Sequence, residues 1–274
     1  MNELAFIRIR NSLLKLINKI PYLRLELENL KMDIVFPPDA FGALEENLLT
    51  GRNIYFDEQS IYRADTIIDL GAHSGSFTLY SILHSKPGTK IVAVEPNEKN
   101  YKLLLVNLKL FENIIKEKKL RVLPLRKAVW IKRGVVRFIE TGWSEGGYIS
   151  VECDDELSCV DAITLDDIIE ISSGKIIAKI DIEGAETAVL ATSKKLEAIT
   201  ELAIEAHGNE RQLVKLLKLH RFNHCIIIMY KLTPYLSKNW LTVKPSIYGL
   251  ATATYRFLTS AFFHPTITII KASK

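Results

Sequence analysis

The sequence predicts an α/β protein with a mostly parallel sheet and helices on both of its faces. From Asp65 onward, short apolar runs alternate with helical segments, which is the pattern of βαβ units. The first of these runs ends in a glycine-containing turn that opens a helix. The 274 residues, 48% hydrophobic and 25% charged, fit one large domain with additions better than two equal domains.

Residues 1–60 are predicted to form a helical extension. In residues 1–20 apolar side chains follow helical spacing, and basic side chains share another face of the same helix. A basic amphipathic helix can lie on an anionic membrane surface, which would make the protein membrane-associated. The alternative is packing on the main domain or on a partner subunit. Pro37-Pro38 breaks the chain, and residues 39–49 are predicted to form a second short helix.

The main domain is predicted to span residues 61–274 and to alternate strands with helices. The segments expected before the middle of the chain are strand 66–70, helix 74–83, strand 90–94, helix 97–111 and strand 121–125. Three short strands at 134–141, 147–152 and 159–163 then indicate a β-hairpin insertion. Thr164 followed by Asp167 resembles a capping box at the start of helix 164–171.

The alternation resumes after this helix and continues to the end of the chain. The remaining segments are strand 176–182, helix 185–196, strand 201–206, helix 210–219 and strands 225–229 and 266–270. Between the last two strands, segment 231–264 is rich in aromatic residues. Packing in the core or in a homodimer interface is one interpretation of this segment, and a lid over the substrate is the other.

Charge and cysteine content restrict the class of protein. The net charge of +4 is not gathered into basic runs, so the sequence does not favour nucleic-acid binding. No segment resembles a signal peptide or a full membrane span. The three cysteines form no CxxC pair, which argues against a disulfide framework or a zinc knuckle. We therefore expect a cytoplasmic location.

The turn after strand 66–70 is the most informative segment for ligand binding. The strand reaches Asp69, and Gly71 and Gly75 follow in a turn that opens the next helix. Enzymes that bind NAD favour GxGxxG here, because the pyrophosphate meets the helix N-terminus. This turn instead reads DxGxxxG. An acidic Asp69 suits the ammonium group of a methionine moiety, so the turn favours S-adenosylmethionine over NAD.

A second acidic residue supports this interpretation. Glu95 ends the next strand, and its distance from Gly71 is close to the roughly 20 residues usual for an acid that binds a ribose. Its carboxylate can accept hydrogen bonds from both ribose hydroxyls. Pro96 and Asn97 then lead into the next helix. The alternative is that Asp69 and Glu95 merely cap the ends of their strands. Ala128, after strand 121–125, lies by topology where the adenine would rest.

A third acidic cluster follows strand 176–182. Asp181, Glu183 and Glu186 surround a strand-to-helix turn at the same edge of the sheet, and His207 lies just after strand 201–206. One of these side chains can act as a general base for an acceptor hydroxyl. Two of the carboxylates could instead hold a divalent metal ion, although no metal-binding spacing supports this. Simple capping of the helix N-terminus is the structural alternative.

Four linked motifs resemble those of the FkbM methyltransferase family over roughly residues 60–230. They are Asp69-Leu-Gly-Ala-His-Ser-Gly, Val94-Glu-Pro-Asn, Thr164-Leu-Asp-Asp and Lys179-Ile-Asp-Ile-Glu-Gly-Ala-Glu. The resemblance implies the Rossmann-like class I methyltransferase sheet, with seven strands of which the last is antiparallel. It also implies methyl transfer to a hydroxyl of a sugar, glycan, lipid or other small molecule, with S-adenosylmethionine as the donor.

The resemblance also assigns residues to roles. It places Asp181, Glu183 and Glu186 beside the reacting centre. Cofactor contacts are implied at Asp69, Gly71, Ala72, His73, Gly75, Glu95, Pro96, Asn97 and Asp181. The chain departs from the family at His73, where the family usually has Asn, so the contact at this position is open. Rival hypotheses are methylation of RNA or protein, a non-catalytic protein that binds S-adenosylmethionine, and an NAD-dependent oxidoreductase.

Overall fold

The computed structural model describes residues 22–27, 32–37, 40–44, 47–48, 53–140, 147–150, 159–231 and 266–274. The predicted amphipathic helix 1–20, and the predicted segment 231–264 beyond its first residue, lie outside these residues. No helix in the described part of the chain is long and apolar enough to cross a membrane.

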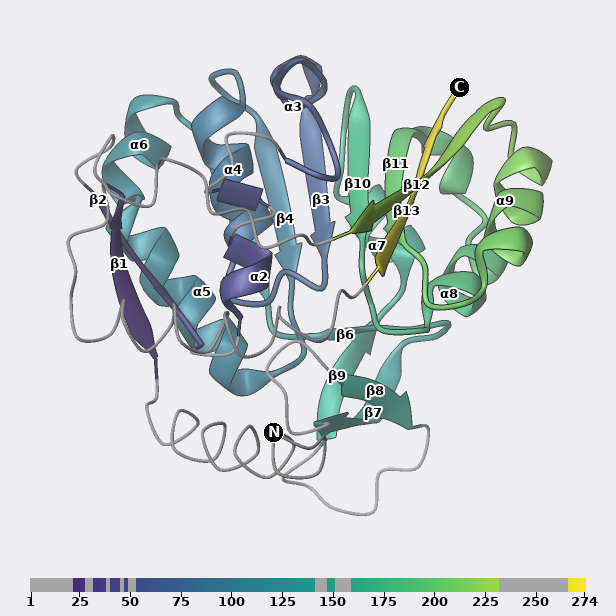
Figure 1. The fold of residues 1–274 in the computed structure, drawn as a ribbon, viewed down its shortest axis with the longest axis horizontal. Helices are drawn as coiled ribbons and strands as arrows, with labels where there is room; N and C mark the ends of the chain where they lie inside the picture. Colours follow the sequence, from purple (N-terminus) through teal and green to yellow (C-terminus); the bar gives the residue numbers. More distant parts are fainter. Residues whose placement is uncertain are drawn as a thin grey trace, which may run out of the picture.

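A seven-stranded sheet forms the centre of the molecule (Figure 1). Its strands lie in the order β12-β13-β11-β10-β3-β4-β5. They are β3 (Thr66–Leu70), β4 (Lys90–Val94), β5 (Arg121–Leu125), β10 (Ile176–Ile180), β11 (Ile199–Glu205), β12 (His224–Lys231) and β13 (Thr266–Ser273). Neighbouring strands from β11 to β5 are parallel, and β13 is antiparallel to both β11 and β12. This arrangement confirms the predicted class I methyltransferase sheet.

Helices cover the two faces of the sheet because its central strands are apolar on both sides. All five residues of β3 and of β10 are buried. The helices are α3 (Glu58–Arg63), α4 (Ser76–His84), α5 (Glu98–Leu110), α6 (Glu112–Glu117), α7 (Leu165–Glu170), α8 (Glu186–Thr192) and α9 (Glu210–Leu219), with a 3-10 turn at Leu196–Ala198. Ile68 and Ala178 pack in one cluster with residues of α7, α8 and α9. Ile67 and Ile177 pack in the other with residues of α3 and α4.

The start of α7 is the capping box that the sequence predicted. The Thr164 side chain accepts a hydrogen bond from the Asp167 N–H at 3.2 Å, and Asp167 accepts one from the Thr164 N–H at 3.0 Å. Arg133 also pairs with the Asp167 carboxylate. These contacts fix where the chain returns from the insertion to the main domain.

The insertion is a second, four-stranded sheet in the order β6-β9-β7-β8. Its strands are β6 (Ala128–Val129), β7 (Gly134–Glu140), β8 (Gly147–Ser150) and β9 (Cys159–Ile163). Figure 1 shows this sheet beyond the edge toward which the arrowheads of β3 and β4 point. The antiparallel pair β7–β8 confirms the predicted hairpin insertion.

The cysteines differ from the expectation drawn from their spacing, which argued against disulfides. Cys159 of β9 is disulfide-bonded, whereas Cys225 is free.

The N-terminal region contains an antiparallel hairpin that the sequence analysis did not predict. Its strands are β1 (Leu23–Leu27) and β2 (Met32–Phe36), and the short helix α2 (Phe41–Leu44) follows within the predicted helix 39–49. The hairpin depends on a tertiary contact that local sequence does not reveal. Asn107 on α5 accepts a hydrogen bond from the Val35 N–H at 2.8 Å and donates to the Val35 carbonyl at 2.7 Å.

Candidate active site

The predicted site residues gather at the carboxyl ends of four neighbouring strands. These strands are β4, β3, β10 and β11, which are adjacent in this order in the sheet. Glu95 follows β4, Gly71 follows β3, Asp181 follows β10, and His207 lies beyond Glu205 at the end of β11. The parallel sheet therefore brings residues from distant parts of the sequence to one edge.

The turn after β3 lies directly against the end of β10. Gly71 has a left-handed backbone with φ of +75°, and a Cβ atom there would lie 1.8 Å from the Asp181 carbonyl oxygen. The N–H groups of Gly71 and Ala72 each donate to the Val94 carbonyl at 3.0 Å. Gly75, with φ of +96°, then caps α4. Only a residue without a side chain fits at Gly71, so the glycine brings the turn and the acidic motif together.

Glu95 is a buried carboxylate that the turn holds in place. Its Oε2 accepts a hydrogen bond from the His73 N–H at 2.8 Å, and its Oε1 accepts one from the Asn97 N–H at 2.9 Å. Burial raises the pKa of Glu95 to about 7 in spite of these two bonds. A carboxylate offers about four lone-pair sites, so each oxygen can accept a further hydrogen bond.

The other residues predicted to contact the adenosine half are Pro96, Asn97 and Ala128. The Asn97 side chain caps α5 by accepting from the N–H groups of Lys99 and Asn100. Pro96 is half-buried beside it, and Ala128 is fully buried in β6. The structure therefore gives Asn97 and Ala128 roles in local packing, and their predicted contacts with the cofactor stay predictions.

Asp69 lies beneath the glycine turn. It is completely buried, and its Oδ2 accepts a hydrogen bond from the Thr78 hydroxyl at 2.5 Å. Its Oδ1 lies 3.6 Å from the Lys179 ammonium. Burial raises the pKa of Asp69, and Lys179 and Thr78 oppose that change. Asp69 is therefore linked to α4 through Thr78, and to the glycine turn through Lys179.

Lys179 is a buried cation that joins the two turns. Its Nζ donates to the Gly71 carbonyl at 2.7 Å and lies 3.1 Å from Asp181 Oδ2. Burial lowers the pKa of Lys179, but the carboxylates of Asp181 and Asp69 outweigh this and raise it above the ordinary value. The lysine therefore remains charged and offsets the two aspartates.

The acidic motif and His207 form a connected set. The buried Glu186 accepts hydrogen bonds through Oε1 from the Gly184 N–H at 3.0 Å and from His207 Nδ1 at 3.1 Å. Burial opposes ionisation of Glu186, but these bonds lower its pKa. His207 Nε2 lies 3.6 Å from Glu183 Oε2. The bond to Glu186 raises the pKa of His207 to about 9, so the imidazole is charged at neutral pH.

Glu183 combines a partly exposed side chain with a raised pKa. Its backbone has a positive φ of 54°, and its side chain is 39% exposed. Burial, with a contribution from Asp181, raises the pKa of Glu183 to about 7. Proton transfer is most efficient when the pKa of the base lies near the working pH.

Two residues at this edge were not among the predicted site residues. The Tyr55 hydroxyl donates to Glu205 Oε2 at 2.7 Å and lies 3.5 Å from Asp181 Oδ2. Burial and the charge of Asp181 raise the pKa of Glu205 to about 7. Glu205 was recognisable as a strand-end acid, but no local pattern marks Tyr55, because its role depends on a contact across the molecule.

Three of these side chains have the composition of a metal site. Asp181, Glu205 and His207 each offer one ligand atom, and these atoms lie within 4.8 Å of one another. However, Lys179 already pairs with Asp181, and Tyr55 already donates to Glu205. The charges that a metal ion would neutralise are therefore partly compensated by the protein.

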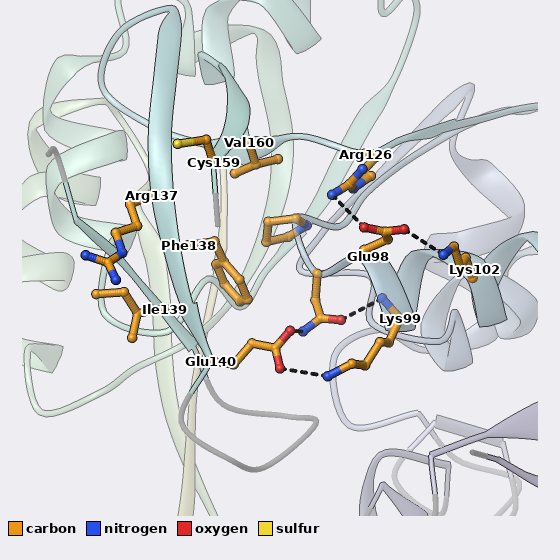
Figure 2. Close-up of a pocket in the computed structure, with 12 residues that line it drawn as sticks. Glu98, Lys99, Lys102, Arg126, Arg137, Phe138, Ile139, Glu140, Cys159 and Val160 are labelled. Carbon is orange, nitrogen blue, oxygen red and sulfur yellow. Dashed lines mark hydrogen bonds and ion pairs between the residues drawn. The ribbon is translucent and has the colours of Figure 1, made fainter. Parts of the chain in front are cut away.

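A cavity of about 490 Å³ lies between the insertion and the start of α5. Pro96 and Asn97 line it on one side, and Phe138 and Glu140 of β7 line it on the other. Figure 2 shows that ion pairs border this cavity. They are Glu98 with Lys102 and Arg126, and Glu140 with Lys99. The cavity is therefore lined by two of the residues predicted to contact the cofactor, Pro96 and Asn97.

Comparison with known proteins gives a match to one family model. The Methyltransferase FkbM domain matches residues 69–225. No curated protein matches the chain.

Solved structures are similar at low identity. A methyltransferase FkbM from Methylobacillus flagellatus KT is 18% identical, with a TM-score of 0.45, over 63% of this chain and 41% of that one. An S-adenosylmethionine-dependent O-methyltransferase from Thermotoga maritima is 15% identical, with a TM-score of 0.43, over 88% of this chain and 73% of that one. The chain thus spans about two fifths of the Methylobacillus protein.

Proposed function

This chain belongs to the FkbM methyltransferase family, and from this premise we propose that it transfers a methyl group from S-adenosylmethionine to a hydroxyl of a sugar, glycan, lipid or other small molecule. The observation that carries the proposal is the contact between the glycine turn and the acidic turn at Gly71 and Asp181. This contact puts the residues suited to the donor next to those suited to proton transfer.

The residues present fit S-adenosylmethionine. Glu95 is fixed by two backbone N–H groups and keeps acceptor capacity for the two ribose hydroxyls. Gly71 in the turn is only partly buried, and Lys179 holds the Gly71 carbonyl in place. The adenosine half then extends from Glu95 toward Pro96 and Ala128. We propose that Asp69, which is completely buried, contributes by supporting the turn and not by touching the ligand.

The chemistry needs a donor, an acceptor and a place for one proton. S-adenosylmethionine supplies a methyl group on a positively charged sulfur. Glu183 accepts the proton of the acceptor hydroxyl as the oxygen–carbon bond forms and the carbon–sulfur bond breaks, which leaves a neutral thioether. His207, held by Glu186, is a cation next to Glu183 and stabilises its carboxylate form. Holding the two reactants in line accounts for most of the rate enhancement.

The proposal is tested by measuring S-adenosylhomocysteine formation with a panel of hydroxylated sugars and lipids. Glu183→Gln should reduce turnover roughly 100-fold or more without changing the affinity for S-adenosylhomocysteine. Glu197→Gln, in the 3-10 turn at Leu196–Ala198, is the control and should retain turnover. Full activity of Glu183→Gln on an identified acceptor would contradict its role as the base.

A further inference from the structure

We propose that Glu205 is a carboxylate of the acceptor side that faces the transferring methyl group, and that Tyr55 is the residue that positions it. This inference rests on the proposed function and deepens it. Neither residue was among the predicted site residues, and Tyr55 lies outside residues 69–225, the part that matches the family. A residue that precedes the matched domain would thus complete its site.

The order of the strands indicates which side receives the acceptor. The ribose is expected at Glu95, just after β4, and the edge then runs through β3 and β10 to β11. The sulfur of the donor is bonded to the 5′ carbon of the ribose, on the side away from the adenine. It is therefore expected beyond β4, toward β10. Glu205, at the end of β11, is therefore on the far side of the methyl group from the ribose.

Hydrogen bonds tie the segment that carries Tyr55 to the cofactor turn. Asn53 Oδ1 accepts from the N–H groups of Tyr55 at 2.9 Å and Phe56 at 3.1 Å. Asn53 Nδ2 donates to Asn47 Oδ1 at 2.8 Å, and Asn47 Nδ2 donates to the Ser76 hydroxyl at 3.2 Å. Both asparagines are buried. Because Ser76 directly follows Gly75, the position of Tyr55 is coupled to the turn that holds the donor.

The Tyr55 ring is fixed as firmly as its backbone. The residue is 2% exposed, and its ring packs edge-on against Phe77 with 5.8 Å between the centroids. The Lys179 ammonium lies 5.4 Å from the ring centroid. The hydroxyl is thereby directed at Glu205 Oε2. Tyr55→Phe keeps these packing contacts and removes the hydroxyl, with its 2.7 Å bond to Glu205 and its 3.5 Å contact with Asp181.

The arrangement also restricts the acceptor. Asp181, Glu183 and Glu205 are all acidic, and Tyr55 uses one hydrogen bond to hold Glu205. A carboxylate accepts hydrogen bonds. The group next to the reacting oxygen is therefore a hydrogen-bond donor, such as a second hydroxyl or an amine.

Sinefungin tests the inference without knowledge of the acceptor. In this analogue of the donor a carbon replaces the sulfur and an amine replaces the transferable methyl group, whereas S-adenosylhomocysteine keeps the sulfur and has no group in place of the methyl. Calorimetric titration of wild type should show sinefungin binding roughly tenfold or more tighter than S-adenosylhomocysteine, because its ammonium reaches the carboxylate. In Glu205→Gln this preference should fall to about threefold or less, while the affinity for S-adenosylhomocysteine stays the same.

Tyr55→Phe should give an intermediate preference, because Glu205 is retained but no longer oriented. Glu201→Gln, earlier in the same strand, and Tyr80→Phe, a buried tyrosine of α4, are the matched controls and should keep the wild-type preference. If Glu205→Gln does not fold, Tyr55→Phe decides the question alone.

The outcomes separate this inference from the proposed function. An unchanged preference in Glu205→Gln or in Tyr55→Phe would overturn the inference and leave donor binding intact. Equal weakening of both ligands in these variants would show a structural role, which also overturns it. Failure of wild type to bind S-adenosylhomocysteine would overturn the proposed function itself, and the inference with it.

Discussion

Gly71→Ala is the perturbation whose effect follows most directly from the structure. A Cβ atom at this position would lie 1.8 Å from the Asp181 carbonyl oxygen, which is backbone and cannot rotate away. The left-handed conformation costs an alanine about 1–2 kcal/mol, and the overlap adds about 1–3 kcal/mol by forcing the two turns apart. We therefore expect a loss of roughly 2–5 kcal/mol in the free energy of unfolding.

Gly88→Ala is the matched control because it isolates the backbone contribution. Gly88 also has a left-handed backbone, with φ of +83°, but no atom lies within 4 Å of a Cβ there. This variant should lose only about 1–2 kcal/mol and keep its affinity for S-adenosylhomocysteine. Gly71→Ala should lose that affinity, because the turn that holds Glu95 through the His73 N–H would be pushed away from Asp181.

Urea unfolding followed by fluorescence, together with calorimetry, provides both readouts. Equal stability loss in the two variants, with donor binding retained in Gly71→Ala, would refute the claim that the close approach at Gly71 builds the site.

Three further predictions test neighbouring parts of the account. Lys179→Met should weaken S-adenosylhomocysteine binding roughly tenfold or more in calorimetry, because Gly71 and the two aspartates lose the cation that they share. Lys175→Met, just before the same strand, should not weaken binding. Equal affinity in the two variants would contradict the role of Lys179. Glu186→Gln should lower the pKa of His207 in an NMR titration, and an unchanged pKa would contradict the bond between them. Asp167→Asn should lower the free energy of unfolding by about 1 kcal/mol at pH 7. The bond from Arg133 lowers the pKa of Asp167, so the stabilisation is complete above the ordinary carboxyl pKa and is lost as pH falls through the lowered value. The free energies of unfolding of wild type and Asp167→Asn should therefore converge in acid. A difference that does not change with pH would contradict this prediction.

The sequence was sufficient to predict the main sheet because its signals are local. Apolar runs such as β3 and β10 are buried on both faces, and the glycine turn and Thr164 capping box are short motifs. The positions of Asp181, Glu183 and His207 at one edge followed from the parallel topology alone. The chain's membership of the family agrees with the resemblance carried by these motifs.

What the sequence did not reveal depends on contacts between distant residues. The β1–β2 hairpin is held by Asn107, and Tyr55 meets Glu205 across 150 positions of the chain. The burial of Asp69 was also not apparent, since a strand-end acid is expected to face the ligand. Its contacts with Thr78 and Lys179 become visible only when α4 and β10 are packed beside β3.

The central claim is that Glu95 and the glycine turn bind S-adenosylmethionine. Calorimetric titration with S-adenosylmethionine, S-adenosylhomocysteine and NAD tests it most directly, on wild type and on Glu95→Ala, with Glu117→Ala, an exposed residue at the end of α6, as the control. We expect the two sulfur nucleosides to bind and NAD not to bind, and we expect Glu95→Ala to weaken binding while Glu117→Ala does not. Absence of binding by either nucleoside, or binding that is indifferent to Glu95, would contradict it.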